Sequence, residues 1–509
     1  MRITNQMITG NSLRNMQKSM SEVNTRTNQM TTGKKISKAS EDPVIAIRAL
    51  KLRTTVRQLE QYKGKNISDA ESWLKITNTS MENITKRITD ISDYCVQGST
   101  DSFSTTDRSA IVDALKQLRS MIYDEGNSTY AGRYIFSGFK TDRSLAFSET
   151  EDTSIYSYDI TQHVKPGSID TKNVVLDGVD YTKVDDYIND PSTYTQINPE
   201  KVYRIHLAYN DIDRANNEGT DVLNINATDA AGNAIDLTGF TINVKETSDA
   251  DTYYKVADNE INVIKETGEI IFGENVYNTL KAADDISVTY AKNNVQSGEL
   301  RPEHYFDCIQ HVVQTDGSVK DITYDKPEEG QSIYYEVNFN QSLKVNTEGN
   351  KVIPEYIGGY IDDLIYTLDE LDAAEKTKIK LEAMLDDPVY SANQDAINQI
   401  KRMISDADIE VAAKKENLQK TFSQNITNFK DYLSTISAIQ SDIGSRMSKL
   451  EMIQTRVTEQ YAEFKELKST NEDVETDEVI IDFNEANLVY ESALAATSNI
   501  MTKTLLDYI

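Results

Sequence analysis

The fold of this chain is decided by residues 67–95, which read ISDAESWLKITNTSMENITKRITDISDYC. Apolar or small residues recur there at alternating steps of three and four, from Ile67 through Leu74 and Ile84 to Cys95. The same alternation returns far downstream, from Leu418 to Leu467. A sustained three-four step places the apolar side chains along one side of a helix, and that side must be buried against another helix. We therefore expect the two stretches to pair as an antiparallel coiled-coil rod.

The predicted core of this rod consists of the largest apolar residues on the two heptad stretches. They are Leu74, Met81, Ile84, Ile88, Ile91, Phe429, Ile436, Ile443, Leu450 and Val457. Helix from Ile400 through Lys468 would be on the order of 100 Å long. A second helix is expected to begin at Pro43, with Asp42 as its N-cap, because proline at the first helical position needs no amide hydrogen.

At each end of the chain, the apolar stripe along one side of the expected helix, which we call a seam, is weaker. The N-terminal seam is rich in methionine and threonine, which specify packing poorly, so a lone helix there would be marginal. A break at Gly33 ends it, and a polar acidic stretch, residues 471–478, precedes the last helix. We expect these end helices to pair with each other. Their candidate residues are Leu13, Met16, Met20, Val23, Met30, Phe483, Tyr490, Leu494, Met501 and Tyr508.

The middle of the chain has a different pattern of residue types. Between residues 146 and 356, short Tyr, Val, Ile and Thr runs alternate with Asp, Asn and Gly turns, which is typical of antiparallel strands. The prediction is a mainly α protein with a β insertion. We expect terminal assembly helices at 1–60 and 470–509, a helical rod at 61–145 and 357–469, and an acidic, β-rich outer domain at 146–356.

Charge is distributed unevenly along the 509 residues, whose net charge is -29. The middle segment holds 38 acidic and 16 basic residues, a net of -22, which argues against a nucleic-acid partner. Residues 1–60 carry +7 and residues 466–509 carry -8, so the two ends suit each other electrostatically. The chain lacks an apolar run of about 18 residues or more, so membrane insertion is not expected. Its first ten residues lack a signal-peptide core.

Few residues are candidates for metal binding or catalysis. His304, Cys308 and His311 have the i, i+4, i+7 spacing of a metal site on a helix, but the surrounding residues equally fit a β edge, where the three would not converge. The pairs Asp185-Asp186 and Asp284-Asp285 lack the alternating spacing of a calcium loop and are expected in turns. Phosphate-loop, serine-elbow and paired-cysteine motifs are missing. We therefore expect no metal, no cofactor and no enzymatic activity, and we expect both cysteines, Cys95 and Cys308, to be buried and unpaired.

Four segments resemble the bacterial flagellins and, more closely, the flagellar hook-filament junction proteins of that superfamily. The segments are Met1 to Met7, Thr31 to Pro43 with its Thr-Gly-Lys and Ser-Glu-Asp-Pro runs, Gly132 to Thr141 (GRYIFSGFKT), and Tyr490 to Ile509. The Gly132 segment is the most specific, because it resembles the part that separates junction proteins from ordinary flagellins. The resemblance covers about residues 1–147 and 358–509.

The resemblance implies a structural adaptor of the extracellular flagellum. Its end helices would fold on assembly into a ring of its own copies, between hook-associated protein 1 and flagellin. It also implies an export chaperone, and secretion through the flagellar apparatus without a cleaved signal peptide.

Two alternatives stay open. The chain could be a flagellin that forms the filament itself, against which the Gly132 to Thr141 segment argues. It could also be an exported adhesin or enzyme whose activity resides in the middle domain. Copy number per flagellum separates the first alternative from the junction role.

Overall fold

The structure is a computed structural model that describes residues 5–99, 105–176, 178–248, 252–326 and 330–501. It is mainly helical with an inserted β-rich region, which confirms the predicted fold class. The chain divides into two compact units. Unit 1 takes its described residues from Met1–Glu71, Tyr335–Leu343 and Arg446–Ile509, and unit 2 takes its described residues from Ser72–Tyr334 and Lys344–Ser445.

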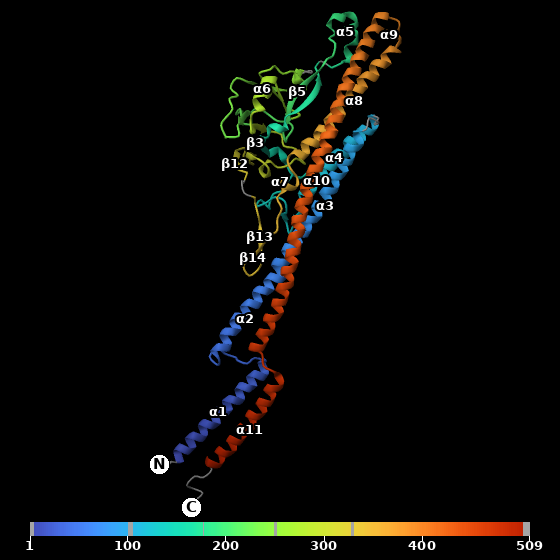
Figure 1. Cartoon of the computed structure of the whole chain (residues 1–509). Coiled ribbons are helices and arrows are strands. Elements are labelled where there is room, and N and C mark those ends of the chain that lie inside the picture. The colour runs from blue at the N-terminus through green and yellow to red at the C-terminus, as the bar shows by residue number, and fades with distance from the viewer. Residues whose placement is uncertain (1–4, 100–104, 177, 249–251, 327–329, 502–509) are drawn as a thin grey trace, which may run out of the picture. The chain divides into compact units, whose positions relative to one another are not determined.

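The main helices lie at the two ends of the sequence, as the heptads predict (Figure 1). Their bounds are α1 Asn5–Thr32, α2 Pro43–Gln61, α3 Ile67–Gly98, α4 Thr105–Gly126, α8 Tyr356–Leu385, α10 Gln394–Glu472 and α11 Thr476–Met501. Short helices are α5 Val184–Asn189, α6 Glu274–Leu280, α7 Gly349–Val352 and α9 Pro388–Ser391. A five-residue π-helix, Tyr62–Asn66, separates α2 from α3.

The start of α2 follows its sequence. The Asp42 carboxylate accepts hydrogen bonds from the amides of Val44 at 2.9 Å and Ile45 at 3.1 Å, and Pro43 occupies the first helical position. Both features were predicted and both are confirmed. The preceding break centres on Gly33, whose φ of 66° is a left-handed conformation that glycine adopts without steric cost.

Within unit 2, the long helices pack antiparallel. Helix α10 lies against α3, because Gln440 hydrogen bonds Thr85 and the Phe422 ring closes on Gly98 further along α3. It also lies against α8, where the Asn425 side chain donates to the Tyr360 carbonyl at 3.3 Å. The described residues therefore include the antiparallel pairing that the heptads indicated.

Two five-stranded sheets form the β-rich region of unit 2. The first has the order β12-β11-β3-β10-β6 and is antiparallel throughout; the second has the order β4-β5-β9-β8-β7, with only β7 and β8 parallel. The first comprises β3 Tyr156–Val164, β6 Asn224–Thr228, β10 Asp285–Lys292, β11 Asp307–Val313 and β12 Val319–Tyr324. The second comprises β4 Asp170–Val175, β5 Pro199–His206, β7 Thr241–Lys245, β8 Glu260–Ile264 and β9 Glu269–Phe272.

Two hairpins complete the strands. β1 Thr129–Tyr130 and β2 Arg133–Tyr134 join through Ala131 and Gly132, both with positive φ. This hairpin lies at the start of the Gly132 to Thr141 segment. β13 Tyr334–Asn338 and β14 Gln341–Lys344 form the other, and its Phe339 ring packs edge-on against Tyr62 of unit 1 at 5.4 Å.

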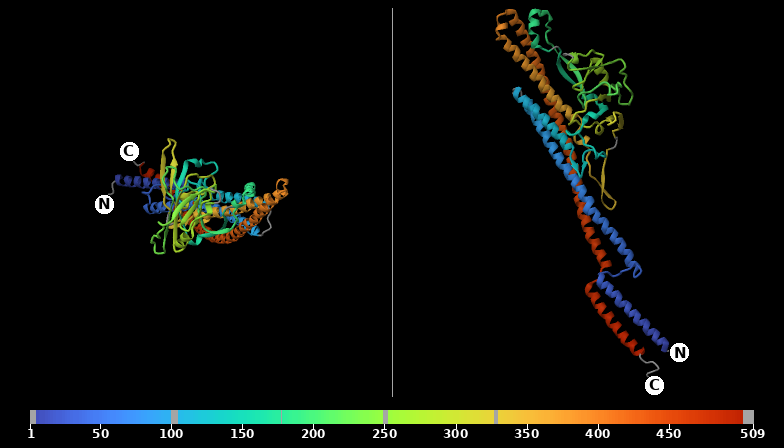
Figure 2. Two further views of the ribbon diagram at one scale, coloured as in Figure 1. Left: turned by 90° about the horizontal axis from the view of Figure 1, so that it is seen from above. Right: turned by 180° about the vertical axis from the view of Figure 1, so that it is seen from behind.

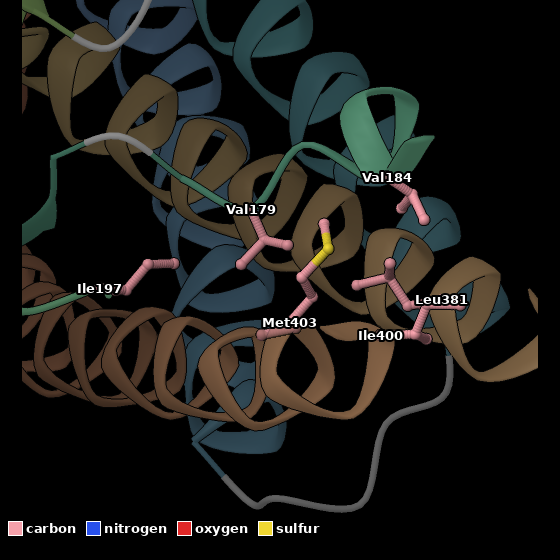
Figure 3. Packing of buried hydrophobic residues seen from close by; sticks show 7 residues of the cluster. Val179, Val184, Ile197, Leu381, Ile400 and Met403 are labelled. Atoms are coloured by element: carbon pink, nitrogen blue, oxygen red, sulfur yellow. The ribbon is translucent and has the colours of Figure 1, made fainter. Parts of the chain in front are cut away.

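The segment between β4 and β5 packs against the helical hairpin of α8 and α10. Its Val179, Val184 and Ile197 are buried. They meet Leu381 of α8 and Met403 of α10 in one apolar cluster (Figure 3). Asp185 and Asp186 lie in the first turn of α5, so the prediction of a turn at this pair is wrong. Carboxylates are favoured at a helix N-terminus, where the free amides are, and this preference explains the difference.

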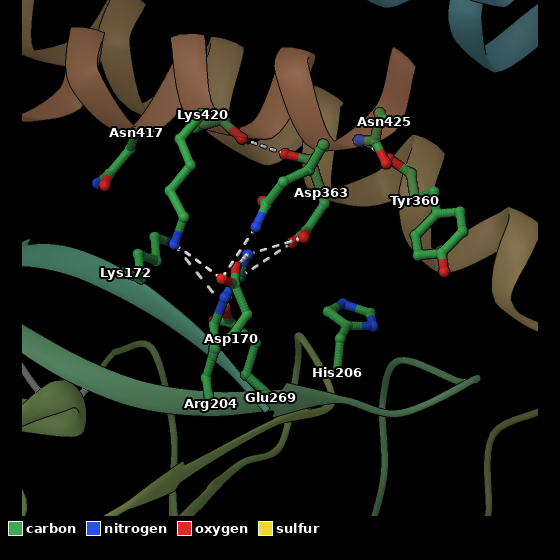
Figure 4. Close-up of polar contacts among 12 residues, drawn as sticks. Asp170, Lys172, Arg204, His206, Glu269, Tyr360, Asp363, Asn417, Lys420 and Asn425 are labelled. Carbon is green, nitrogen blue, oxygen red and sulfur yellow. Dashed lines mark hydrogen bonds and ion pairs between the residues drawn. The ribbon is translucent and has the colours of Figure 1, made fainter. Parts of the chain in front are cut away.

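A buried charge network joins the second sheet to the same two helices (Figure 4). The Arg204 guanidinium on β5 donates to both carboxylate oxygens of Asp363 on α8, at 2.9 and 2.8 Å, and to Glu269 on β9. Lys172 on β4 donates to Tyr254 at 2.7 Å and to Glu370 on α8 at 3.1 Å. The sheet is thus tied to α8 by charge-assisted hydrogen bonds from Arg204 and Lys172, which are buried.

Acid should weaken this network. Burial by itself would raise the pKa of the Glu269 carboxyl, but Lys172 and Arg204 outweigh it and hold that pKa well below its usual range. The pKa of Asp170 is also lowered: burial would raise it, but hydrogen bonds from Lys420 and Gln424 outweigh that effect. Because both folded-state pKa values lie below the unfolded values of about 4, the stabilisation is complete above pH 4 and is lost as the pH falls through the folded values.

We therefore expect the unfolding free energy of unit 2 to fall steeply below about pH 4. Trp73, the sole tryptophan, is buried in unit 2 and reports its unfolding by fluorescence in denaturant titrations. The variant Glu269→Gln should be less stable at pH 6 and show a shallower loss between pH 4 and pH 2.5. If the unfolding free energies of the unchanged chain and of Glu269→Gln fall equally between pH 4 and pH 2.5, Glu269 does not cause the acid sensitivity.

Candidate assembly surface

The two end helices lie side by side in unit 1 (Figures 1 and 2). Arg26 of α1 and Asp482 of α11 form an ion pair at 2.9 Å. Burial across the pair is shallow. Among the described side chains α1 has none that is fully buried, and α11 has only Val479 and Thr497. Such a pair gains little from apolar burial, so its stability within one chain is small.

The predicted assembly residues divide into two groups. Leu13, Met16, Val23, Phe483 and Tyr490 are half-buried between the helices. Met20, Met30 and Leu494 remain exposed, at 57%, 44% and 48%. The Met501 side chain and Tyr508 lie outside the described residues. Val479, which the seam did not include, is the most buried apolar residue of α11, at 4% exposure.

A cluster of charged residues connects the break after α1 to the break between α10 and α11. The Glu472 side chain is 4% exposed and accepts two hydrogen bonds from Arg53 of α2, both at 2.7 Å. Lys34 approaches Glu472 at 3.7 Å and pairs more closely with Asp473. The backbone joins the same two breaks, since the Lys35 amide donates to the Glu472 carbonyl at 2.7 Å.

The pKa values of this cluster reflect the pairing. The hydrogen bond to Glu472 raises the pKa of Arg53, and the hydrogen bonds from Lys34 and Ser469 lower the pKa of Asp473. Sequence reasoning missed the cluster. One sequence feature could have indicated it. The helix break at Gly33 lies in the basic N-terminal segment, and the break near residue 473 lies in the acidic C-terminal segment.

Replacing Glu472 by alanine should loosen the end helices. The change removes the buried carboxylate that accepts two hydrogen bonds from Arg53. The loss of stability should be about 1–2 kcal/mol, because Arg53 is half-exposed. Amide hydrogen exchange of α1 and α11 should accelerate about fivefold or more, measured by mass spectrometry of peptides, while exchange in unit 2 stays unchanged. The control is Glu466→Ala, an exposed glutamate on the same helix. Equal exchange in both variants would show that the cluster does not hold the end helices.

All ten predicted core residues of the heptad stretches are buried. Leu450 is the most exposed at 3%, Phe429 is 1% exposed and the other eight are 0% exposed. These side chains belong to the interior and are not available to a partner. The end helices and α2 differ from this interior, because large apolar residues remain exposed on them.

The histidine and cysteine trio does not form a metal site. Cys308 and His311 lie on strand β11, three residues apart and so on opposite faces, whereas His304 ends a short turn before it. His311 pairs with Asp321 at 2.7 Å and with Asp159 at 3.1 Å. Burial lowers the pKa of His304 to about 4 and raises that of the Cys308 thiol. Across the described ranges, we find no cluster of three or more acidic, histidine or cysteine side chains that could hold a metal ion.

Known proteins resemble this chain over part of its length. Residues 3–141 match the N-terminal helical region of bacterial flagellin. Flagellar hook-associated protein 3 of Escherichia coli strain K12 is 31% identical over 156 residues, 29% of this chain and 47% of that protein. The protein of the same name from Salmonella typhimurium strain LT2 is 30% identical over 149 residues, 28% of this chain and 45% of that protein. The chain thus spans about half the length of these curated relatives.

Among solved structures, flagellar hook associated protein-3 from Legionella pneumophila aligns with 82% of this chain and 97% of its own length. Its identity is 11% and its TM-score 0.30, so the alignment carries no argument about function.

The class of protein that this chain resembles is that of the bacterial flagellins, because residues 3–141 match their N-terminal helical region. Within that class, the two curated matches confirm the closer resemblance to flagellar hook-associated protein 3. The match to a flagellin region agrees with the expectation of a structural protein. In the part of the chain that the structure describes, each helix is too short or too polar to cross a bilayer.

Proposed function

We propose that this chain is a structural component of the bacterial flagellum that acts as an adaptor at the hook-filament junction. One observation carries the proposal: α1 and α11 pair with little buried surface, in a chain whose residues 3–141 match flagellin. A shallow pair of this kind gains its main stabilisation from neighbouring subunits, as expected for coupled folding and assembly.

Each of the three predicted domains has its own role in this proposal. The end helices, 1–60 and 470–509, assemble copies of the chain into a ring between hook-associated protein 1 and flagellin. The heptad segments, 61–145 and 357–469, support them, and the acidic region 146–356 faces outward. The chain reaches the extracellular flagellum through the flagellar secretion apparatus with an export chaperone, without a cleaved signal peptide.

Electron microscopy of a strain that lacks the gene tests this function. We expect hooks without filaments, with flagellin shed into the medium. The runner-up function, a filament-forming flagellin, predicts that no flagellin-sized filament protein is shed. Normal filaments in the deletion strain would contradict both functions.

Complementation of that strain tests the end helices. A chain with Met16→Asp and Val23→Asp places charges between α1 and α11 and should restore no filaments, although it is found in the medium. The matched control, Asn15→Asp with Asn24→Asp, changes exposed positions on the same helix and should restore filaments. Filaments with the first variant would show that this seam is not needed for assembly.

A further inference from the structure

Helix α2 has an apolar face that nothing in the described chain covers. Its large aliphatic residues Val44, Ile47 and Leu50 are 62%, 59% and 70% exposed. Spaced at i, i+3 and i+6, they lie along one side of the helix and span about 9 Å. We call this surface, with the exposed Arg48, Lys51 and Arg57 around it, the α2 face.

Helix α11 has an apolar face of matching length. Ile481 and Leu488 are 66% and 65% exposed and stand i, i+7 apart, about 10 Å along the helix. Carboxylates surround them where the α2 face has cations. The residues of this α11 face are Ile481 and Leu488 with the exposed Asp477, Glu478 and Glu485.

The charges of the two faces are free to meet a partner. Among the described residues, neither the three cations of the α2 face nor the three carboxylates of the α11 face belong to an ion pair. Opposite charges that border two apolar strips of equal length are typical of surfaces that dock on each other, since the charges set orientation and the strips supply burial. In unit 1 the two faces do not cover one another, because both are exposed.

We propose that the α2 face of one copy of this chain binds the α11 face of the next copy. The proposal rests on the proposed function, because it names a contact within the assembled ring. One chain carries both halves, so the contact is heterologous and repeats from subunit to subunit until the ring closes or a helix propagates.

Crosslinking in assembled flagella tests the contact directly. Two tagged versions, Leu50→Cys and Leu488→Cys, are co-expressed in the deletion strain, and a short bis-maleimide is applied to isolated flagella. The natural cysteines are buried and do not compete. We expect a crosslinked dimer that holds one copy of each version, and none when either version is expressed alone. Filaments that form without this dimer would overturn the contact.

A charge exchange tests its specificity. The acidic α2 variant is Arg48→Glu with Lys51→Glu, and the basic α11 variant is Glu478→Lys with Glu485→Lys. Each alone brings like charges together, and filaments per cell should fall at least about tenfold. Co-expression should restore them, because an acidic α2 face then meets a basic α11 face wherever the two variants are neighbours. Controls with the same charge changes on exposed α10 positions, Lys430→Glu with Lys449→Glu and Glu451→Lys with Glu459→Lys, should assemble normally.

The outcomes separate this contact from the junction role. Single variants that assemble like the wild type, or secreted variants that co-expression does not rescue, would overturn the contact and leave the junction role intact. Filaments in the uncomplemented deletion strain would contradict the junction role, and the crosslink between copies would still report on the contact.

Discussion

Replacing Ile84 and Ile88 by aspartate is expected to unfold unit 2. Both side chains are 0% exposed on α3, so each substitution buries a carboxylate without a partner. The cost is at least about 4 kcal/mol, a large part of the stability of a typical domain. Trp73 fluorescence should show an unfolded unit at neutral pH, or a denaturation midpoint shifted far toward low denaturant.

The control places the same charges on the exposed side of the same helix. Thr79→Asp and Thr89→Asp add two carboxylates at exposed positions and should change the unfolding free energy by less than about 1 kcal/mol. If the isoleucine variant unfolds at the same denaturant concentration as this control, the α3 seam is not part of a core.

The second large effect is expected from the buried charge network. Arg204→Met removes the guanidinium that serves Asp363 and Glu269, leaving both carboxylates in a buried site without their main partner. Breaking a buried pair in this way costs about 3–5 kcal/mol. Denaturation followed by Trp73 fluorescence should show that loss at pH 7. The loss should be smaller at pH 3 than at pH 7, because acid already weakens the same network in the unchanged protein.

An exposed ion pair in the same region provides the matched control. Arg214 and Asp221 meet at 2.8 Å, but their side chains are 50% and 52% exposed. Arg214→Met should therefore cost less than about 1 kcal/mol. Equal losses for the two arginine variants would show that the second sheet does not depend on the network.

Local patterns predicted the helical parts of the fold. Heptad spacing identifies the buried side of α3 and α10 because helix periodicity is a property of neighbouring residues. The cap at Asp42 and the break at Gly33 are equally local. The alternating apolar runs indicated strands between residues 146 and 356, but not their order, since the sequence does not state which strand pairs with which.

The contacts that join distant segments could not be predicted. Lys172 meets Glu370 across 198 positions, and Arg53 meets Glu472 across 419. Any of the many acidic residues could have served as partner. The π-helix at Tyr62–Asn66 was missed because helix-forming residues alone do not distinguish one wider turn from continuous α-helix. The α2 face was missed because exposure, unlike periodicity, depends on the whole fold.

Immunogold labelling of intact flagella tests the junction role most directly. Antibodies raised against the purified chain and absorbed against flagellin are applied to wild-type cells, and the gold particles are located by electron microscopy. We expect one short band per flagellum, where the hook meets the filament. Label along the whole filament, or an unlabelled junction, would contradict the junction role.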